Sequence, residues 1–201
     1  MKNLRVLLVF ALLAFGSAAM AQNGRSFYNS PYKTRNSGSF DKSTGLLTFS
    51  YGFPNVPVRG YSYAGFGGPD RLGFGPVYVK YEHGLLDEVG IGGQAAFAVG
   101  KVDYGADEAN ITAFHFAVLG YYHFNKLIPI KVLDVYAGTG LAFRSRAVNW
   151  DNDADLDDSS TRVYVPFKVG ARWYFKPRLG LYLEAGYDDM SDVNLGITLR
   201  M

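Results

Sequence analysis

Hydrophobic and polar residues alternate most regularly in the stretch VNLGITLRM, residues 193–201. Hydrophobic side chains occupy its odd positions, and polar or small residues occupy its even positions. A period of two is that of an extended strand whose two faces differ. A soluble core and a lipid bilayer would both produce this local pattern, so the pattern alone does not say what contacts the hydrophobic face.

Similar alternation recurs along the chain and predicts eight strands. They are expected near residues 44–53, 75–83, 87–101, 110–124, 132–146, 162–175, 178–188 and 192–201. After residue 21 there is no run of about 18 apolar residues, so spanning helices are not expected. The connections after the first, third and fifth strands are longer than those after the second, fourth and sixth, as in up-and-down outer-membrane barrels.

The two faces of these strands differ in bulk and charge. One face is bulky, aromatic and uncharged, whereas the other is rich in small residues. The second face also carries Lys80, Glu82, Asp134, Arg144, Arg146, Lys168, Arg172, Glu184, Asp188 and Arg200. An eight-stranded barrel has an interior only just wide enough for side chains to fill, so the bulky face must point outward. An uncharged exterior fits lipid, where a midplane Lys or Arg costs about 2–4 kcal/mol. The sequence therefore predicts an all-β fold, an eight-stranded antiparallel up-and-down transmembrane β-barrel.

The N-terminal residues have the order of a secretory signal peptide. Basic residues within 1–5 precede an apolar run over 6–15, and a small-residue segment ends in Ala-Met-Ala at 19–21. We expect cleavage before Gln22; the alternative is an uncleaved anchor helix, for which the apolar run is short. Residues 22–43 are polar and lack periodicity, which indicates an N-terminal periplasmic tail, and residues 44–201 form the barrel.

Charge and cysteine content exclude several classes of protein. Removal of residues 1–21 leaves 20 − 2 = 18 basic residues against 18 acidic residues, so a nucleic-acid partner is not expected. The chain has no cysteine, which excludes disulfides, a lipoprotein anchor and thiolate metal sites. No motif implies a cofactor.

Together, the N-terminal segment, the eight strands, the segment GPVYVKYEHGLLDEVGIGGQAAF (75–97) and the terminal strand resemble a known family. They are similar to small Gram-negative outer-membrane β-barrel proteins of the OmpX, OmpW and OmpA-barrel kind, especially the porin-like barrels of Bacteroidetes. The resemblance implies a place in the cell outer membrane, in contact with lipid and lipopolysaccharide. Met201 departs from the Phe or Trp that usually ends such terminal strands.

Charged and histidine side chains on the inward face are the first candidate site. We expect a polar network in the lumen made by Lys80, Glu82, His115, Arg144, Lys168, Arg172, Glu184 and Arg200. Buried charges are normally retained in pairs, so Glu82 or Glu184 is expected to pair with Lys168 or Arg172. The alternative is a proton or ion path; an aqueous channel needs about twice as many strands.

Catalysis and metal binding are not expected. No histidine stands beside a serine, as a nucleophile and its general base would require, so we predict no catalytic residues. Asp151, Asp153 and Asp155 alternate as in a calcium loop, but Leu156 and Arg162 occupy the positions of its glycine and its bidentate glutamate. We therefore assign no metal ligands.

The first long loop, residues 54–73, holds the second candidate site. Arg59, Tyr61, Tyr63 and Phe66 are of the residue types favoured in protein interfaces; alternatively, they fold the loop onto the barrel rim. The sequence thus predicts a barrel with a plugged polar lumen and a structural or surface-interaction role. The alternatives are a small OmpW-like transporter of apolar solutes and a secreted soluble ligand-binding barrel with its apolar face inward.

Overall fold

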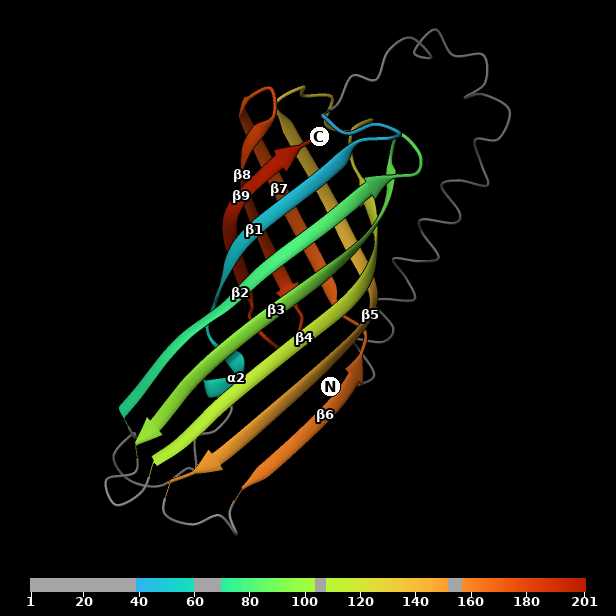
Figure 1. Ribbon diagram of the computed structural model, residues 1–201. Coiled ribbons are helices and arrows are strands. Elements are labelled where there is room, and N and C mark those ends of the chain that lie inside the picture. Colours follow the sequence, from blue (N-terminus) through green and yellow to red (C-terminus); the bar gives the residue numbers. More distant parts are fainter. Residues whose placement is uncertain (1–38, 60–69, 104–107, 152–156) are drawn as a thin grey trace, which may run out of the picture. The chain divides into compact units, whose positions relative to one another are not determined.

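A computed structural model describes residues 39–59, 70–103, 108–151 and 157–201 (Figure 1). The strands are β1 (Gly45–Phe53), β2 (Asp70–Gly84), β3 (Val89–Asp103), β4 (Glu108–His123), β5 (Leu133–Trp150), β6 (Asp158–Tyr164), β7 (Phe167–Lys176), β8 (Leu179–Tyr187) and β9 (Val193–Arg200), with one short helix, α2 (Val56–Arg59). Within these ranges, no helix has the length and hydrophobicity needed to cross a membrane. The predicted signal peptide and the tail up to residue 38 lie outside the described residues.

The strands close into an antiparallel barrel of eight positions, as predicted. Consecutive strands pair with each other except β6 and β7, and β1 pairs with β9 to close the ring. β6 and β7 share one position, because both pair with β5: β6 pairs with residues 142–148 and β7 with residues 133–139. The topology is up-and-down, which leaves no open sheet edge where the ring is complete.

The single strand expected over 162–175 is divided in the structure. β6 ends at Tyr164 and β7 begins at Phe167, so Val165 and Pro166 belong to neither strand. Proline has no backbone N–H to donate to the ladder, which accounts for the interruption.

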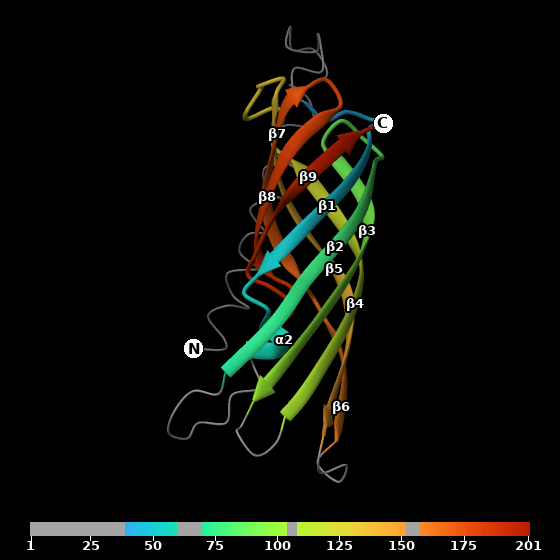
Figure 2. The same cartoon turned by 60° about the vertical axis from the view of Figure 1, so that its left-hand side comes forward.

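Several strands are longer than predicted. β2 begins at Asp70 and β5 ends at Trp150, so residues 70–73 of the expected first loop and 147–150 of the expected third loop are strand. Because β3 ends at Asp103 and β4 spans Glu108–His123, the 104–107 connection is shorter than the 124–132 connection at the other end, and the expected contrast in connection length is weaker. At the end that carries the 104–107 connection, the lower end in Figures 1 and 2, strands β2 to β6 extend beyond β1, β7, β8 and β9. This extension is called the protruding sheet.

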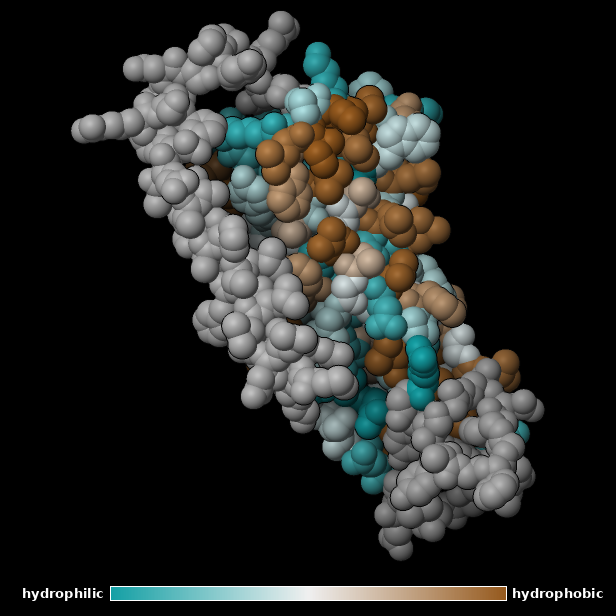
Figure 3. Space-filling view, turned by 180° about the vertical axis from the view of Figure 1, so that it is seen from behind, coloured by the Kyte–Doolittle hydropathy of each residue, from teal (hydrophilic) through white to brown (hydrophobic). Residues whose placement is uncertain are grey.

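The bulky hydrophobic face of the strands points outward. Exposed side chains on the barrel wall include Phe49, Val79, Phe116, Val118, Leu141, Val169, Leu183, Leu195 and Ile197. Figure 3 shows hydrophobic side chains over much of the wall on one side. A soluble ligand-binding barrel would have the opposite arrangement, whereas an apolar exterior over closed strands is the surface of a membrane barrel.

The protruding sheet differs from the barrel wall in polarity. Its outer face carries exposed Lys101 and Asp103, four and six residues beyond the outward aromatic Phe97, together with exposed Leu72 and Phe74. Its inner face is apolar, and Val102, Ile111 and other residues are buried against Val58 of α2. The appearance of charged residues on the outer face marks one boundary of the apolar barrel wall.

The turn between β8 and β9 folds into the barrel. Met190 in this turn is fully buried beside Tyr78, and its carbonyl accepts a hydrogen bond from the Val56 backbone N–H (2.9 Å). The Asp192 N–H donates to the Phe53 carbonyl at 3.2 Å. The turn and α2 are therefore held together inside the barrel wall.

Candidate functional site

The inward face brings most of the sequence-predicted polar residues together. Side chains below one-tenth exposed on this face include Lys80, Glu82, His115, Arg144, Lys168, Arg172 and Glu184, whereas Arg200 is partly exposed. Alternation along each strand places them inside, because successive side chains of a strand point to opposite faces of the sheet. Lys80, Glu82, Lys168, Arg172 and Glu184 belong to two ion-paired clusters, whereas His115, Arg144 and Arg200 lie outside both.

The arginine cluster consists of Arg172, Glu82, Asp134 and His123. The Arg172 guanidinium donates to Glu82 Oε2 at 2.6 Å and to Asp134 Oδ2 at 2.7 Å. His123 lies within hydrogen-bond distance of the same carboxylates, with Nε2 at 2.6 Å from Glu82 Oε1 and Nδ1 at 2.7 Å from Asp134 Oδ1. Both imidazole nitrogens donate only in the imidazolium form, and in that form the cluster has two positive and two negative charges.

The lysine cluster consists of Lys80, Lys168, Glu184 and Asp188. Lys80 forms an ion pair with Glu184, and Lys168 contacts Asp188 at 2.6 Å and Glu184 at 3.6 Å. Tyrosines complete the carboxylate contacts, since Tyr136 donates to Glu184 (2.8 Å) and Tyr78 donates to Asp188 (2.7 Å). Charges buried in this way are tolerated because each has an opposite charge and hydrogen bonds.

His115 lies in a polar chain apart from both clusters. Its Nδ1 is 2.8 Å from the Tyr164 hydroxyl, and its Nε2 is 2.6 Å from the amide of Gln94. Among the described residues, no serine hydroxyl is a hydrogen-bond partner of either His115 or His123. In the same part of the chain, no three His, Asp or Glu side chains come together as metal ligands.

Residues before the first strand cover the arginine cluster. The Phe40 ring stacks on His123 with a centroid distance of 3.5 Å and an interplanar angle of 5°. Asn125 holds this segment by donating to the Phe40 carbonyl at 2.7 Å. Phe40 is only 2% exposed, although it lies in a segment that the sequence marks as a polar tail.

The two remaining arginines lie toward opposite ends of the barrel. Arg144 forms an ion pair with Asp189 at 3.0 Å, beside the β8–β9 turn. The Arg200 guanidinium stacks over the Tyr174 ring at 4.0 Å from its centroid, a cation–π contact. Neither arginine belongs to the two clusters.

Only one of the four loop candidates falls within the described residues. Arg59 is the last residue of α2 and is exposed. Tyr61, Tyr63 and Phe66 lie outside the described residues. Asp153 and Asp155, from the calcium-loop comparison, also lie outside them.

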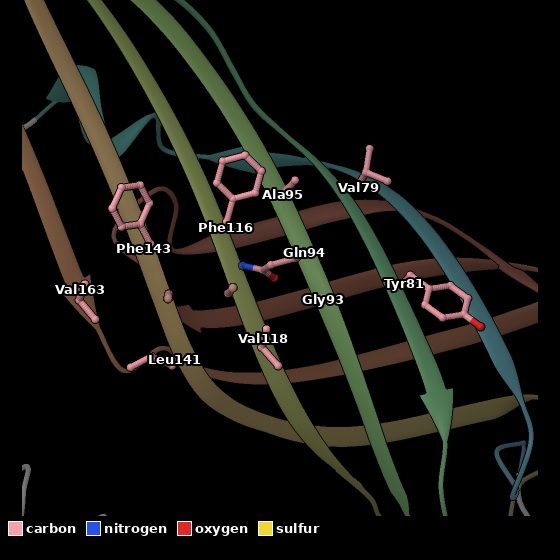
Figure 4. A pocket seen from close by; sticks show the side chains of 12 residues that line it. Val79, Tyr81, Gly93, Gln94, Ala95, Phe116, Val118, Leu141, Phe143 and Val163 are labelled. Atoms are coloured by element: carbon pink, nitrogen blue, oxygen red, sulfur yellow. The ribbon is translucent and has the colours of Figure 1, made fainter.

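A hollow of about 720 Å³ lies on the outer wall (Figure 4). Its floor is formed at Gly93 and Ala95 of β3, and larger side chains such as Phe116, Phe143 and Tyr81 surround it. This hollow faces away from the lumen, because Gly93 and Ala95 alternate with the buried Gln94. It is separated from the charged clusters by the barrel wall.

The sequence did not single out several residues that complete the lumen. Tyr78, Tyr136 and Tyr182 are fully buried on the inward face, and Phe40 caps one end of the arginine cluster. The tyrosines could have been found from the sequence, because they occupy even positions on the same strand face as Lys80 and Glu184. For Phe40 there was no periodic signal, because its segment does not alternate.

Comparison with solved structures gives the fold. OprG from Pseudomonas aeruginosa is 9% identical, with a TM-score of 0.51, and the match covers 81% of this chain and 98% of that chain. The N-terminal β-barrel domain of OprF from the same organism is 13% identical (TM-score 0.45; 80% and 98% covered). Ail, the attachment invasion locus protein of Yersinia pestis, is 11% identical (TM-score 0.45; 80% and 95% covered).

No protein-family model and no curated protein sequence matches this chain. The likeness to OprG and the closed strand order show that the chain has the fold of the small eight-stranded outer-membrane β-barrels. The resemblance noted in the sequence is confirmed at the level of the fold.

Proposed function

We propose that this protein is an outer-membrane β-barrel with a plugged polar lumen and a structural or surface-interaction role. The membrane placement is supported by the apolar outer wall and by the fold shared with OprG. In the proposed orientation, the short turns between β2 and β3 and between β7 and β8 face the periplasm, and the protruding sheet faces the cell exterior, as in outer-membrane barrels generally.

The observation that carries the plugged lumen is the burial of its ion pairs. Lys168 and Asp188 lie 2.6 Å apart, and their side chains are 1% and 0% exposed. Ordered water in a channel would leave such groups accessible, since aqueous barrels are wider. The arginine cluster, the lysine cluster and the inward β8–β9 turn occupy successive levels of the same interior.

A planar-bilayer recording tests the plug. The purified protein should give no stable single-channel conductance, and liposomes that contain it should not swell in small sugars. The matched variant replaces the β8–β9 turn residues Met190 and Ser191 with glycine, which removes two buried side chains from the interior. Steady conductance of the unmodified protein would exclude the plug, and uptake of apolar solutes would favour the transporter alternative.

The interaction role is assigned to the end that carries the protruding sheet. Its outer face carries the exposed charged residues Lys101 and Asp103, and Arg59 of α2 is exposed at the same end, so this surface suits a partner in water better than lipid. A pull-down in mild detergent should compare the intact chain with one in which residues 60–69 are replaced by a Gly-Ser linker. Because Val58 is part of a buried cluster, the replacement begins after α2. Loss of co-purifying protein is expected; unchanged recovery would contradict a loop-mediated role.

We also propose that the protein has no enzymatic activity. In the described interior, His123 is within hydrogen-bond distance of two carboxylates, and His115 of Tyr164 and Gln94. Neither histidine therefore contacts a serine hydroxyl of the described residues that it could activate as a general base. Incubation of the folded protein with lipid A and with phospholipids should therefore leave both unchanged by mass spectrometry. Release of a fatty acid that His115→Ala abolished would contradict this proposal.

A further inference from the structure

Three basic residues follow one another along the rim formed by the short turns. They are Lys131, Lys176 and Arg178, and all three side chains are exposed. Backbone hydrogen bonds hold their segments side by side, since the Tyr174 N–H donates to the Val132 carbonyl (2.8 Å) and β7 turns directly into β8. We call these three residues the basic arc.

The charge of this arc is not balanced by nearby carboxylates in the described structure. None of its three residues forms an ion pair with another described residue. Elsewhere on the same rim, Lys126 forms an ion pair with Glu88 at 2.5 Å, and the backbone N–H of Lys42 donates a hydrogen bond to Asp87 at 3.2 Å. Carboxylates therefore lie beside the segments that carry Lys42 and Lys126, whereas no carboxylate of the described residues forms an ion pair with the arc.

Large apolar side chains lie immediately next to the arc. Trp173 and Phe175 point outward with 53% and 47% of their surface exposed, and Ile130 is 47% exposed. In membrane barrels, outward aromatic residues at the strand ends occupy the headgroup level. Lys176 and Arg178 lie one and three residues beyond Phe175, and Lys131 directly follows Ile130, so these flexible basic side chains reach the level of lipid phosphates.

We propose that the basic arc is a binding site for anionic phospholipid headgroups of the surrounding leaflet. The phosphate accepts hydrogen bonds from the ammonium groups of Lys131 and Lys176 and from the guanidinium of Arg178, and the acyl chains lie on Trp173 and Phe175. A zwitterionic lipid offers the same phosphate, but its own cation offsets the attraction. The arc therefore enriches anionic lipid on one side of the barrel.

This inference rests on the proposed placement of the barrel in a membrane, and a quenching experiment separates the two. The chain has two tryptophans, Trp150 and Trp173, so a Trp150→Phe background leaves a single tryptophan, which lies beside the arc. The protein is reconstituted in phosphatidylcholine vesicles with increasing amounts of brominated phosphatidylglycerol or brominated phosphatidylcholine. Bromine quenches tryptophan on contact, so the two curves give the relative binding constant of the anionic lipid near Trp173.

We expect the ratio of the binding constant of phosphatidylglycerol to that of phosphatidylcholine to be about three or more at low salt. The triple variant Lys131→Gln, Lys176→Gln, Arg178→Gln should lower this ratio to about one. The matched control Lys42→Gln, Lys126→Gln, which removes basic residues from the part of the rim that also carries Asp87 and Glu88, should leave the ratio unchanged.

Each other result has a distinct meaning. Equal quenching by the two lipids in the unmodified arc would overturn the inference and leave the membrane barrel intact. Absence of quenching by either lipid would overturn the membrane placement itself. If Trp150→Phe fails to fold, spin-labelled phosphatidylglycerol and phosphatidylcholine measured with the unsubstituted chain give the same comparison, and equal immobilisation of the two would again overturn the inference.

Discussion

Arg172 and His123 hold the same two carboxylates from opposite sides. Each carboxylate, Glu82 and Asp134, uses one oxygen for the guanidinium and the other for the imidazole. The four side chains come from β2, β4, β5 and β7, so the ring of contacts ties together strands across the barrel. Removal of one member leaves the others buried without their partners.

Arg172→Ala should be strongly destabilising. It removes one positive charge from beside two buried carboxylates, and breaking a buried pair in this way costs about 3–5 kcal/mol. Arg162→Ala is the control, because Arg162 pairs with Asp189 at 3.4 Å with 56% of its side chain exposed. Exposed pairs contribute about 0–1 kcal/mol. Urea unfolding in lipid vesicles, followed by tryptophan fluorescence, measures both, and similar losses would contradict a special role for the cluster.

Phe40→Ala should open the arginine cluster to water. The Phe40 ring covers His123, and loss of a buried phenylalanine costs about 3 kcal/mol or more. The imidazole C2–H of His123 should therefore exchange with deuterium faster in this variant, as measured by mass spectrometry. Phe175→Ala removes an outward ring instead and should leave that exchange unchanged. Equal exchange in unmodified and Phe40→Ala protein would show that Phe40 does not shield the histidine.

Gly170→Ala and Gly93→Ala should differ in effect although both change a strand glycine. A Cβ at Gly170 would overlap the Tyr136 phenol ring, which donates to Glu184 at 2.8 Å. Moving that ring disturbs the lysine cluster, and overpacking of this kind costs about 1–3 kcal/mol. At Gly93, on the outer hollow, the nearest atom to a Cβ would be 3.7 Å away, so the change should stay within about 0.5 kcal/mol. A greater loss from Gly93→Ala in the same urea assay would reverse this expectation.

The sequence was sufficient to predict the barrel because its signal is repeated in every strand. Alternation fixes which side chains share a face, and interior volume then decides which face is inside. In β9, for example, Asn194 and Thr198 are fully buried whereas Leu195 and Ile197 are exposed. The break at Pro166 was also readable from the sequence, since proline is excluded from paired strand interiors.

The partners within the lumen could not be chosen from the sequence. Pairing depends on register between strands, and a period of two does not fix register. Glu82 and Glu184 each had two candidate partners, and the structure pairs Arg172 with Glu82 and Lys168 with Glu184. The cap by Phe40 was beyond prediction because its segment has no period and depends on contacts distant in the chain, such as the one with Asn125.

Single-cysteine scanning along β9 tests most directly that the hydrophobic face contacts lipid and the charged face is enclosed. The chain has no cysteine, so each introduced thiol can carry one spin label. Labels at Leu195 and Ile197 should collide readily with oxygen, which concentrates in lipid, and labels at Asn194 and Thr198 should be shielded from both oxygen and a water-soluble nickel complex. An alternation of the opposite phase, or nickel access at Leu195 and Ile197, would contradict the account.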